Sequence, residues 1–99
     1  PGAPYLEDLI DGLVYGETWT RDQLSTRDRS LATIAVTLAG YQSDQLRVHL
    51  QRGLDNGVTV QEISELIAHI TLYSGFPTGV NASRMFAEIL EDRGIPLPD

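Results

Sequence analysis

Two histidines carry most of the capacity of this sequence for acid–base chemistry. His49 lies beside Leu50 in a segment of helical period, one position from an apolar stripe, so its ring should flank the buried face without lying wholly inside it. An imidazole with a pKa near 6.5 can donate and accept a proton at neutral pH. His49 is therefore the candidate proton carrier. The alternative is a boundary histidine that hydrogen-bonds to a neighbouring helix.

The second histidine, His69, lies between Leu66 and Tyr73, two positions expected to face the core. A polar ring in such a place needs a partner that offsets its desolvation, so a structural role is an alternative to substrate binding. Two histidines this far apart in the sequence are a weak metal signal, and we expect no metal.

Basic residues and cysteines limit the remaining chemistry. All seven basic side chains are arginine, and the chain has no cysteine and no lysine. Schiff-base chemistry, disulfides, thiolate zinc sites and thiol peroxidase reactions are therefore excluded. Arginine presents a planar fork that binds carboxylates in bidentate fashion, which favours an acidic organic ligand.

The chain has 99 residues and a formal charge of −7, which fits one small acidic domain. Its charge would repel a phosphate backbone or an anionic lipid surface, so nucleic acid and membrane are poor partners. No apolar run approaches the roughly 20 residues of a membrane span, and we expect a cytoplasmic protein. So short a chain buries little surface, and assembly into a homo-oligomer would help it.

Further polar candidates cluster around the only tryptophan. Glu17, Trp19 and Arg21 lie in a segment, 17–24, that lacks hydrophobic period and is expected to be a loop. Trp19 would cover a pocket or, alternatively, anchor the loop to the core or to a neighbouring subunit. Arg27 and Arg29 fall in the first turn of a helix, where the macrodipole disfavours cations, so an acidic partner is expected.

Hydrophobic repeats of helical period, separated by capping signals, predict an all-α fold of about five helices in a single domain, residues 1–99. The expected helix starts are Ser25 with Asp28, Ser43 or Asp44, and the capping box Thr59–Glu62. Gly40, Asn56-Gly57, Gly75 and Gly94 are the expected ends. The apolar positions that recur at helical spacing are Leu6, Leu9, Ile10, Leu13, Leu31, Ile34, Ala35, Leu38, Leu46, Leu50, Leu54, Val80, Phe86, Ile89 and Leu90. In the fourth helix Ile63, Leu66, Ile67 and Ile70 are expected to face inward.

The order and spacing of these pieces resemble the carboxymuconolactone decarboxylase family. The motifs are Gly16-Glu17-x-Trp19-x-Arg21, Arg27-x-Arg29-Ser30-Leu31-x-Thr33, Leu46-x-x-His49, Asn56-Gly57-Val58-Thr59 with Glu62-Ile63, and Tyr73-x-Gly75-x-Pro77. The resemblance covers about residues 12–92. It implies an AhpD-like helical bundle that assembles as a trimer or hexamer, with pockets near subunit contacts.

Two chemistries occur in this superfamily, and the sequence separates them. The AhpD-like alkylhydroperoxidases use a Cys-x-x-Cys pair ahead of the histidine, whereas Gln42 and Gln45 stand at those positions here, and Ser30 stands at the peroxidase's upstream glutamate position. The resemblance therefore implies the cysteine-free, decarboxylase-type branch. Its reaction converts a carboxylated muconolactone to an enol-lactone, with loss of CO2 and without a cofactor, in aromatic-compound breakdown.

The family positions also imply roles for the site. His49 would donate the proton, Arg21 or Arg29 would hold or polarise carboxylate or carbonyl oxygens, and Glu17 would orient His49 or handle a second proton. The remaining substrate-binding candidates are Trp19, Tyr73 and His69.

The sequence departs from the family at 21–24, where Arg-Asp-Gln-Leu replaces the usual Arg-Pro-Gly-Leu and adds a negative charge. Two alternatives therefore stay open. One is other acid–base chemistry in the same pocket, such as isomerisation or dehydration. The other is a non-catalytic oligomeric binding module.

Overall fold

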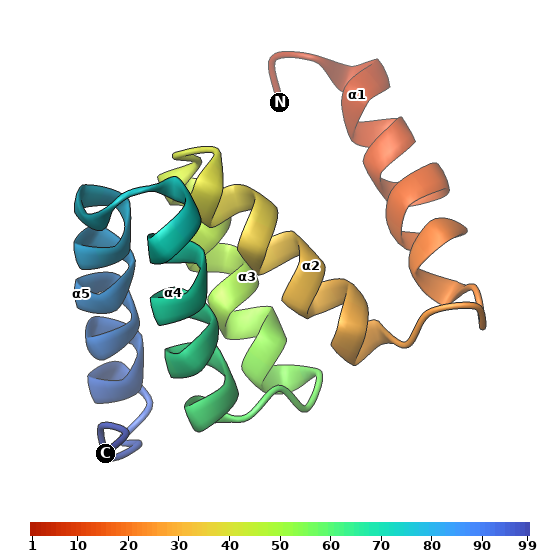
Figure 1. The fold of residues 1–99 in the computed structure, drawn as a ribbon. Coiled ribbons are helices and arrows are strands. Elements are labelled where there is room, and N and C mark those ends of the chain that lie inside the picture. The colour runs from red at the N-terminus through yellow and green to blue at the C-terminus, as the bar shows by residue number, and fades with distance from the viewer.

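Five α-helices and two short helical segments make up the chain in the computed structural model, which describes residues 1–99 (Figure 1). There is no strand, so the all-α prediction is confirmed. In chain order the elements are α1 (Pro4–Leu9), η1 (Ile10–Tyr15), η2 (Thr18–Thr20), α2 (Thr26–Ala39), α3 (Ser43–Asp55), α4 (Val60–Ser74) and α5 (Phe76–Asp92). None of these helices is long and apolar enough to cross a membrane.

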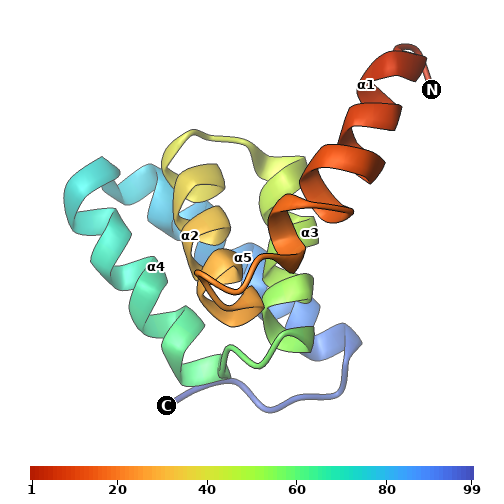
Figure 2. The ribbon, with the colours of Figure 1, turned by 90° about the vertical axis from the view of Figure 1, so that its right-hand side faces the viewer.

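Helices α2 to α5 form the body of the molecule and enclose its core, while α1 projects from one side (Figures 1 and 2). The core contains eleven buried hydrophobic residues, among them Ile34, Leu50, Ile63 and Leu90, which are fully enclosed. All four body helices contribute to it. These four helices therefore supply the fixed frame on which a site can be built.

Helix ends follow the local chemistry of the sequence. Ser25 Oγ accepts a hydrogen bond from the backbone N–H of Asp28 at 3.0 Å. Thr59 and Glu62 form the reciprocal capping box. One expected cap was wrong: α3 begins at Ser43 itself, and its N-cap is Gln42, which makes no side-chain hydrogen bond to the helix. The chain enters the helix from a tight turn in which Tyr41 has φ 59°, and no side chain caps the first turn.

The apolar stripe of the first helix does not face the core. Leu6, Leu9 and Leu13 are 54%, 36% and 50% exposed, and α1 packs mainly against η1. An amphipathic pattern requires that one face be covered, but it does not say by which surface. Val80, in the apolar pattern of the last helix, is 52% exposed on α5.

A wide helical turn carries the chain from α1 toward the body. Helical structure continues through Gly12, and the turn ends where Gly16 N–H donates to the carbonyl of Asp11 at 2.9 Å, an i to i−5 bond. A Cβ on Gly16 would lie 2.7 Å from that same oxygen, so the turn requires glycine. After it, the segment expected to be a loop contains a single 3₁₀ turn, η2.

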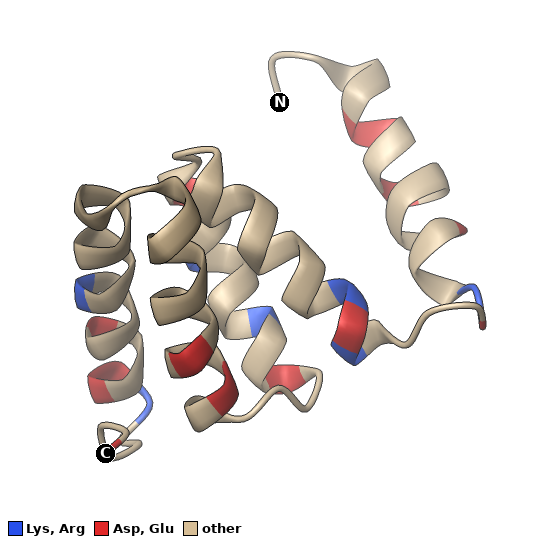
Figure 3. Ribbon diagram, viewed as in Figure 1, with Lys and Arg blue, Asp and Glu red and all other residues tan.

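The body carries charges of both signs, whereas α1 carries only acidic ones (Figure 3). Arg27, at the start of α2, forms ion pairs with Asp28 and Glu62, which supplies the acidic partner expected for a cation in that first turn. Arg93 binds Asp55 at 2.8 Å and ties the end of α5 to the end of α3.

Candidate active site

His49 lies on α3 and is only 5% exposed, so the expectation that its ring would merely flank the buried face was wrong. The reason is Trp19 of η2, which stacks on the imidazole with ring centroids 6.2 Å apart and planes 19° apart. The N-terminal segment thus folds over a position that the periodicity of α3 alone leaves at the boundary. Trp19 packs on the candidate proton carrier itself. That it covers a substrate pocket stays a prediction.

Two residues that the sequence analysis missed extend this arrangement. Tyr15, from η1, lies against Trp19 with ring centroids 5.7 Å apart. Arg52 places its guanidinium carbon 4.8 Å from the centre of the Tyr15 ring and donates a hydrogen bond to the Tyr15 hydroxyl. Arg52 follows His49 by three positions on the same helix, a spacing that places the two side chains together and would have revealed it. No sequence signal pointed to Tyr15.

We call Tyr15 and Trp19 the aromatic cover. The electrostatics beneath it keep His49 neutral. Burial lowers the pKa of His49 below its ordinary value near 6.5, and the positive charge of Arg52 lowers it further. Its Nδ1 is fully buried and has no hydrogen-bond partner. A neutral imidazole with an unused nitrogen is a group whose protonation an incoming charge can change.

This lowered pKa predicts a pH dependence of stability. The unfolded chain takes up the His49 proton near pH 6.5 and the folded chain only at lower pH, so the free energy of unfolding should fall as the pH drops below about 6.5. Urea unfolding at pH 7.5 and 5.5 measures the loss, and a His49→Gln variant should lose less.

The Asp55 carboxyl does not interfere with that comparison, because its hydrogen bond with Arg93 lowers its pKa from an ordinary value of 3.8. It therefore titrates below the window. If the parent and His49→Gln lost equal free energies of unfolding between pH 7.5 and 5.5, the folded state would not lower the pKa of His49.

The remaining candidates, Glu17, Arg21 and Arg29, lie around η2 and at the start of α2. Arg29 donates hydrogen bonds to the backbone carbonyls of Leu24 (3.2 Å) and Arg21 (3.4 Å), so its guanidinium secures the connection from η2 to α2. The Arg21 side chain is exposed and forms no ion pair. Glu17 accepts hydrogen bonds at its backbone carbonyl from Thr20. None of these three side chains forms a hydrogen bond or ion pair with His49.

His69 and Tyr73 form a separate pair on the outer face of α4, with ring centroids 5.2 Å apart. Both are exposed, Tyr73 by 81%, and neither contacts the aromatic cover, so the expectation that they flank or occupy the core was wrong. Within this chain the structure therefore does not bring them to His49.

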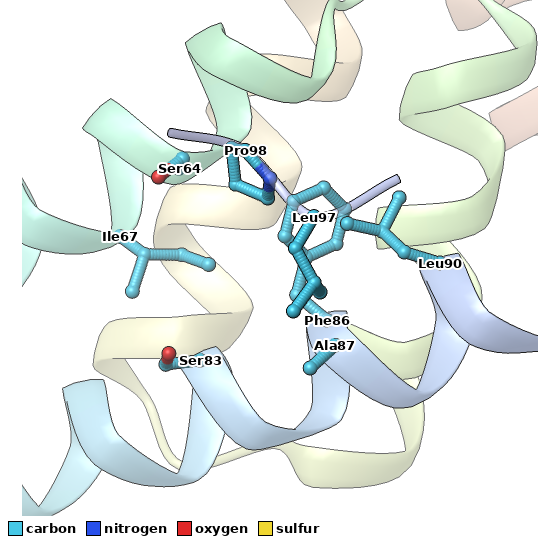
Figure 4. Close-up of a pocket in the computed structure, with 8 residues that line it drawn as sticks. All are labelled: Ser64, Ile67, Ser83, Phe86, Ala87, Leu90, Leu97 and Pro98. Atoms are coloured by element: carbon cyan, nitrogen blue, oxygen red, sulfur yellow. The ribbon is translucent and has the colours of Figure 1, made fainter. Parts of the chain in front are cut away.

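The hollows of the surface lie elsewhere. One of about 300 Å³ opens between α4 and α5 beneath the C-terminal tail, lined by Ser64, Ile67, Ser83, Phe86, Ala87, Leu90, Leu97 and Pro98 (Figure 4). It has no ionisable side chain and offers no acid–base group. None of the five principal hollows is lined by His49, because Trp19 occupies the space against the ring. No three His, Cys, Asp or Glu side chains come together as metal ligands.

The site is thus a single buried histidine under aromatic rings, beside an arginine, in a cysteine-free helical chain. The sequence relationships of the chain identify its family. The chain belongs to the carboxymuconolactone decarboxylase family, whose model matches residues 4–88, and the resemblance drawn from the motifs is confirmed.

Among the relatives is a 4-carboxymuconolactone decarboxylase of Acinetobacter baylyi, 44% identical over 90% of this chain and 66% of its own length. A nitrosuccinic acid decarboxylase of Metarhizium robertsii is 29% identical over 87% of this chain and 60% of its own length. An uncharacterized 15.0 kDa protein of Paracoccus denitrificans is 35% identical over 71% of this chain and 53% of its own. The chain therefore spans between about half and two thirds of the length of these relatives.

Proposed function

We propose that this chain is a cofactor-free decarboxylase that acts on a small carboxylated lactone, with His49 as the proton donor. The observation that carries the proposal is the buried imidazole of His49, with an unpartnered ring nitrogen, stacked under Trp19 and next to the guanidinium of Arg52. The 44% identical relative, a 4-carboxymuconolactone decarboxylase, supports the same reaction class.

The reaction balances with the groups at hand. The bond between the carboxylate carbon and the ring carbon breaks, CO2 leaves, and the electron pair is delocalised into the conjugated lactone carbonyl. A ring carbon then accepts a proton from the His49 imidazolium. General acid catalysis of this kind contributes about 10²- to 10⁴-fold to a rate.

The lowered pKa of His49 suits this step because the imidazole becomes charged only when substrate is bound. In the free protein the imidazole is neutral. A substrate carboxylate placed beside it favours the imidazolium and raises the pKa of His49. The bound acid thereby favours uptake by His49 of the proton that the decarboxylation consumes.

Release of CO2 from purified protein tests the proposal. We expect turnover with an unsaturated γ-lactone that carries a carboxylate on the ring carbon, and none with its saturated counterpart, which cannot delocalise the electron pair. Nitrosuccinate belongs in the same panel, because a nitro group also accepts the electrons left by CO2 and a relative bears that activity in its name. Isomerisation or dehydration of these acids without CO2 would favour other acid–base chemistry, and no reaction at all would favour a binding module.

The proposal includes a homo-oligomer, trimer or hexamer, in which a second copy covers the apolar face of α1. Exchange of Leu6 and Leu13 to Glu should lower the mass measured by light scattering, because two charges would then lie on that face. The control is Gln23→Glu with Gln61→Glu, which adds the same charge at exposed positions of the loop and of α4. An unchanged mass in the leucine variant would contradict this use of α1.

A further inference from the structure

Arg52 differs from most other arginines of the chain in what it contacts. Three arginines, Arg27, Arg47 and Arg93, form ion pairs with carboxylates, and Arg29 is held by backbone carbonyls. Arg52 forms no ion pair, although the chain has fourteen acidic side chains. Its partners are the ring and the neutral hydroxyl of Tyr15.

This environment leaves the charge of Arg52 uncompensated next to a histidine. A guanidinium binds a carboxylate through two parallel hydrogen bonds between opposite charges, which adds both energy and geometric specificity. A phenol hydroxyl accepts only one such bond and carries no negative charge. Arg52 is therefore poised to exchange Tyr15 for an anion.

We propose that Arg52 is the residue that binds the carboxylate of the substrate, and that Tyr15 is its partner only while the site is empty. This inference rests on the proposed function for the identity of the acid. It adds a substrate-binding residue that is distinct from Arg21 and Arg29, neither of which is joined to the His49 cluster by a hydrogen bond or an aromatic contact.

The exchange has a consequence for the aromatic cover. Tyr15 lies on Trp19, and Trp19 lies on His49, so the contact between Arg52 and Tyr15 is one of those that hold the cover closed over the imidazole. A carboxylate that takes the guanidinium away from Tyr15 loosens the cover at the moment the acid arrives. It also places a negative charge beside His49, where the charged group that acts on the imidazole is Arg52.

Binding of a non-reactive acid tests Arg52 separately from turnover. The probe is 5-oxotetrahydrofuran-2-carboxylate, a saturated lactone acid, and its neutral methyl ester is the charge control. Trp19 is the only tryptophan, so its fluorescence reports binding at this site directly. The protein should bind the acid about 10- to 100-fold more tightly than the ester, as expected for a charge-assisted hydrogen-bonded pair.

Exchange of Arg52 to Gln should abolish that preference for the acid. The matched control is Arg84→Gln, because Arg84 is also exposed and without an ion pair but lines a second hollow on α4 and α5, which His49 does not line. The control should keep the full preference. Tyr15→Phe should bind the acid at least as tightly as the parent, since it removes only the resting partner, and a loss of tenfold or more would overturn that role of Tyr15.

The outcomes separate this inference from the proposed function. If the lactone acids release CO2 but Arg52→Gln keeps the preference for the acid, the role of Arg52 is refuted and the decarboxylase stands. If no acid is decarboxylated but the preference exists and is lost in Arg52→Gln, the anion site stands and the reaction is another one. The NMR titration of His49 adds a readout: the acid should raise its pKa in the parent protein and have little effect in Arg52→Gln.

Discussion

Replacing His49 by Gln is expected to lower kcat for decarboxylation by at least ~100-fold, the usual contribution of a general acid. Glutamine keeps a polar side chain of similar size under Trp19 but cannot become a cationic proton donor at neutral pH. Steady-state CO2 release measures the loss, and circular dichroism confirms that the variant is folded. Gln45→Ala, an exposed change one turn earlier on α3, is the control and should retain its activity.

The pH profile makes the same prediction more specific. Because a bound carboxylate raises the pKa of His49, activity should decline with rising pH, and the decline in kcat should occur at higher pH than the decline in kcat/KM. If activity instead rose with pH through this range, neutral His49 would be acting as a base, and the proton-donor assignment would be wrong.

The second large effect concerns the packing of α4 against α5. A Cβ added to Gly79 would lie 1.8 Å from Oγ1 of Thr71 and 2.8 Å from its Cβ, so the two helices must move apart. We expect Gly79→Ala to lower the free energy of unfolding by about 3 kcal/mol, at the upper end of ordinary overpacking costs. For a domain of this size the melting temperature should fall by roughly 10–25 °C.

Gly12→Ala is the matched control for that substitution. Gly12 also lies in a helical segment, but a Cβ there would have no atom within 4 Å. Removing the flexibility of glycine at such a position stabilises by about 0.4–1 kcal/mol. Calorimetric melting of the two variants should therefore give shifts of opposite sign, and similar shifts would mean that the contact between Gly79 and Thr71 does not fix the distance between the helices.

Much of the fold follows from local sequence signals. Side-chain caps at Ser25 and Thr59 and the turn at Gly75 set helix boundaries through hydrogen bonds and φ values that span only a few residues, so they can be predicted without a structure. The placement of α1 depends on a surface outside its own sequence. For that reason the apolar stripe of this helix could be predicted from the sequence, but its position at the surface could not.

The site could be predicted only in part, for the same physical reason. His49 was found from its residue type and helical position, and Trp19 from its isolation in a loop. The burial of His49 depends on a tertiary contact between residues thirty positions apart. Arg52 was overlooked because its role depends on Tyr15, which belongs to a different element and carries no sequence signal.

The segment that supplies Tyr15 and Trp19 has a consequence for how members of such a family diverge. No residue of α1, η1 or η2 is buried, so the first 24 residues contribute little to the core that holds α2 to α5 together. Substitutions in this N-terminal arm alter what reaches His49 at small cost to folding. Substrate selectivity can thus change through the N-terminal arm, while the core of α2 to α5 keeps the same stability.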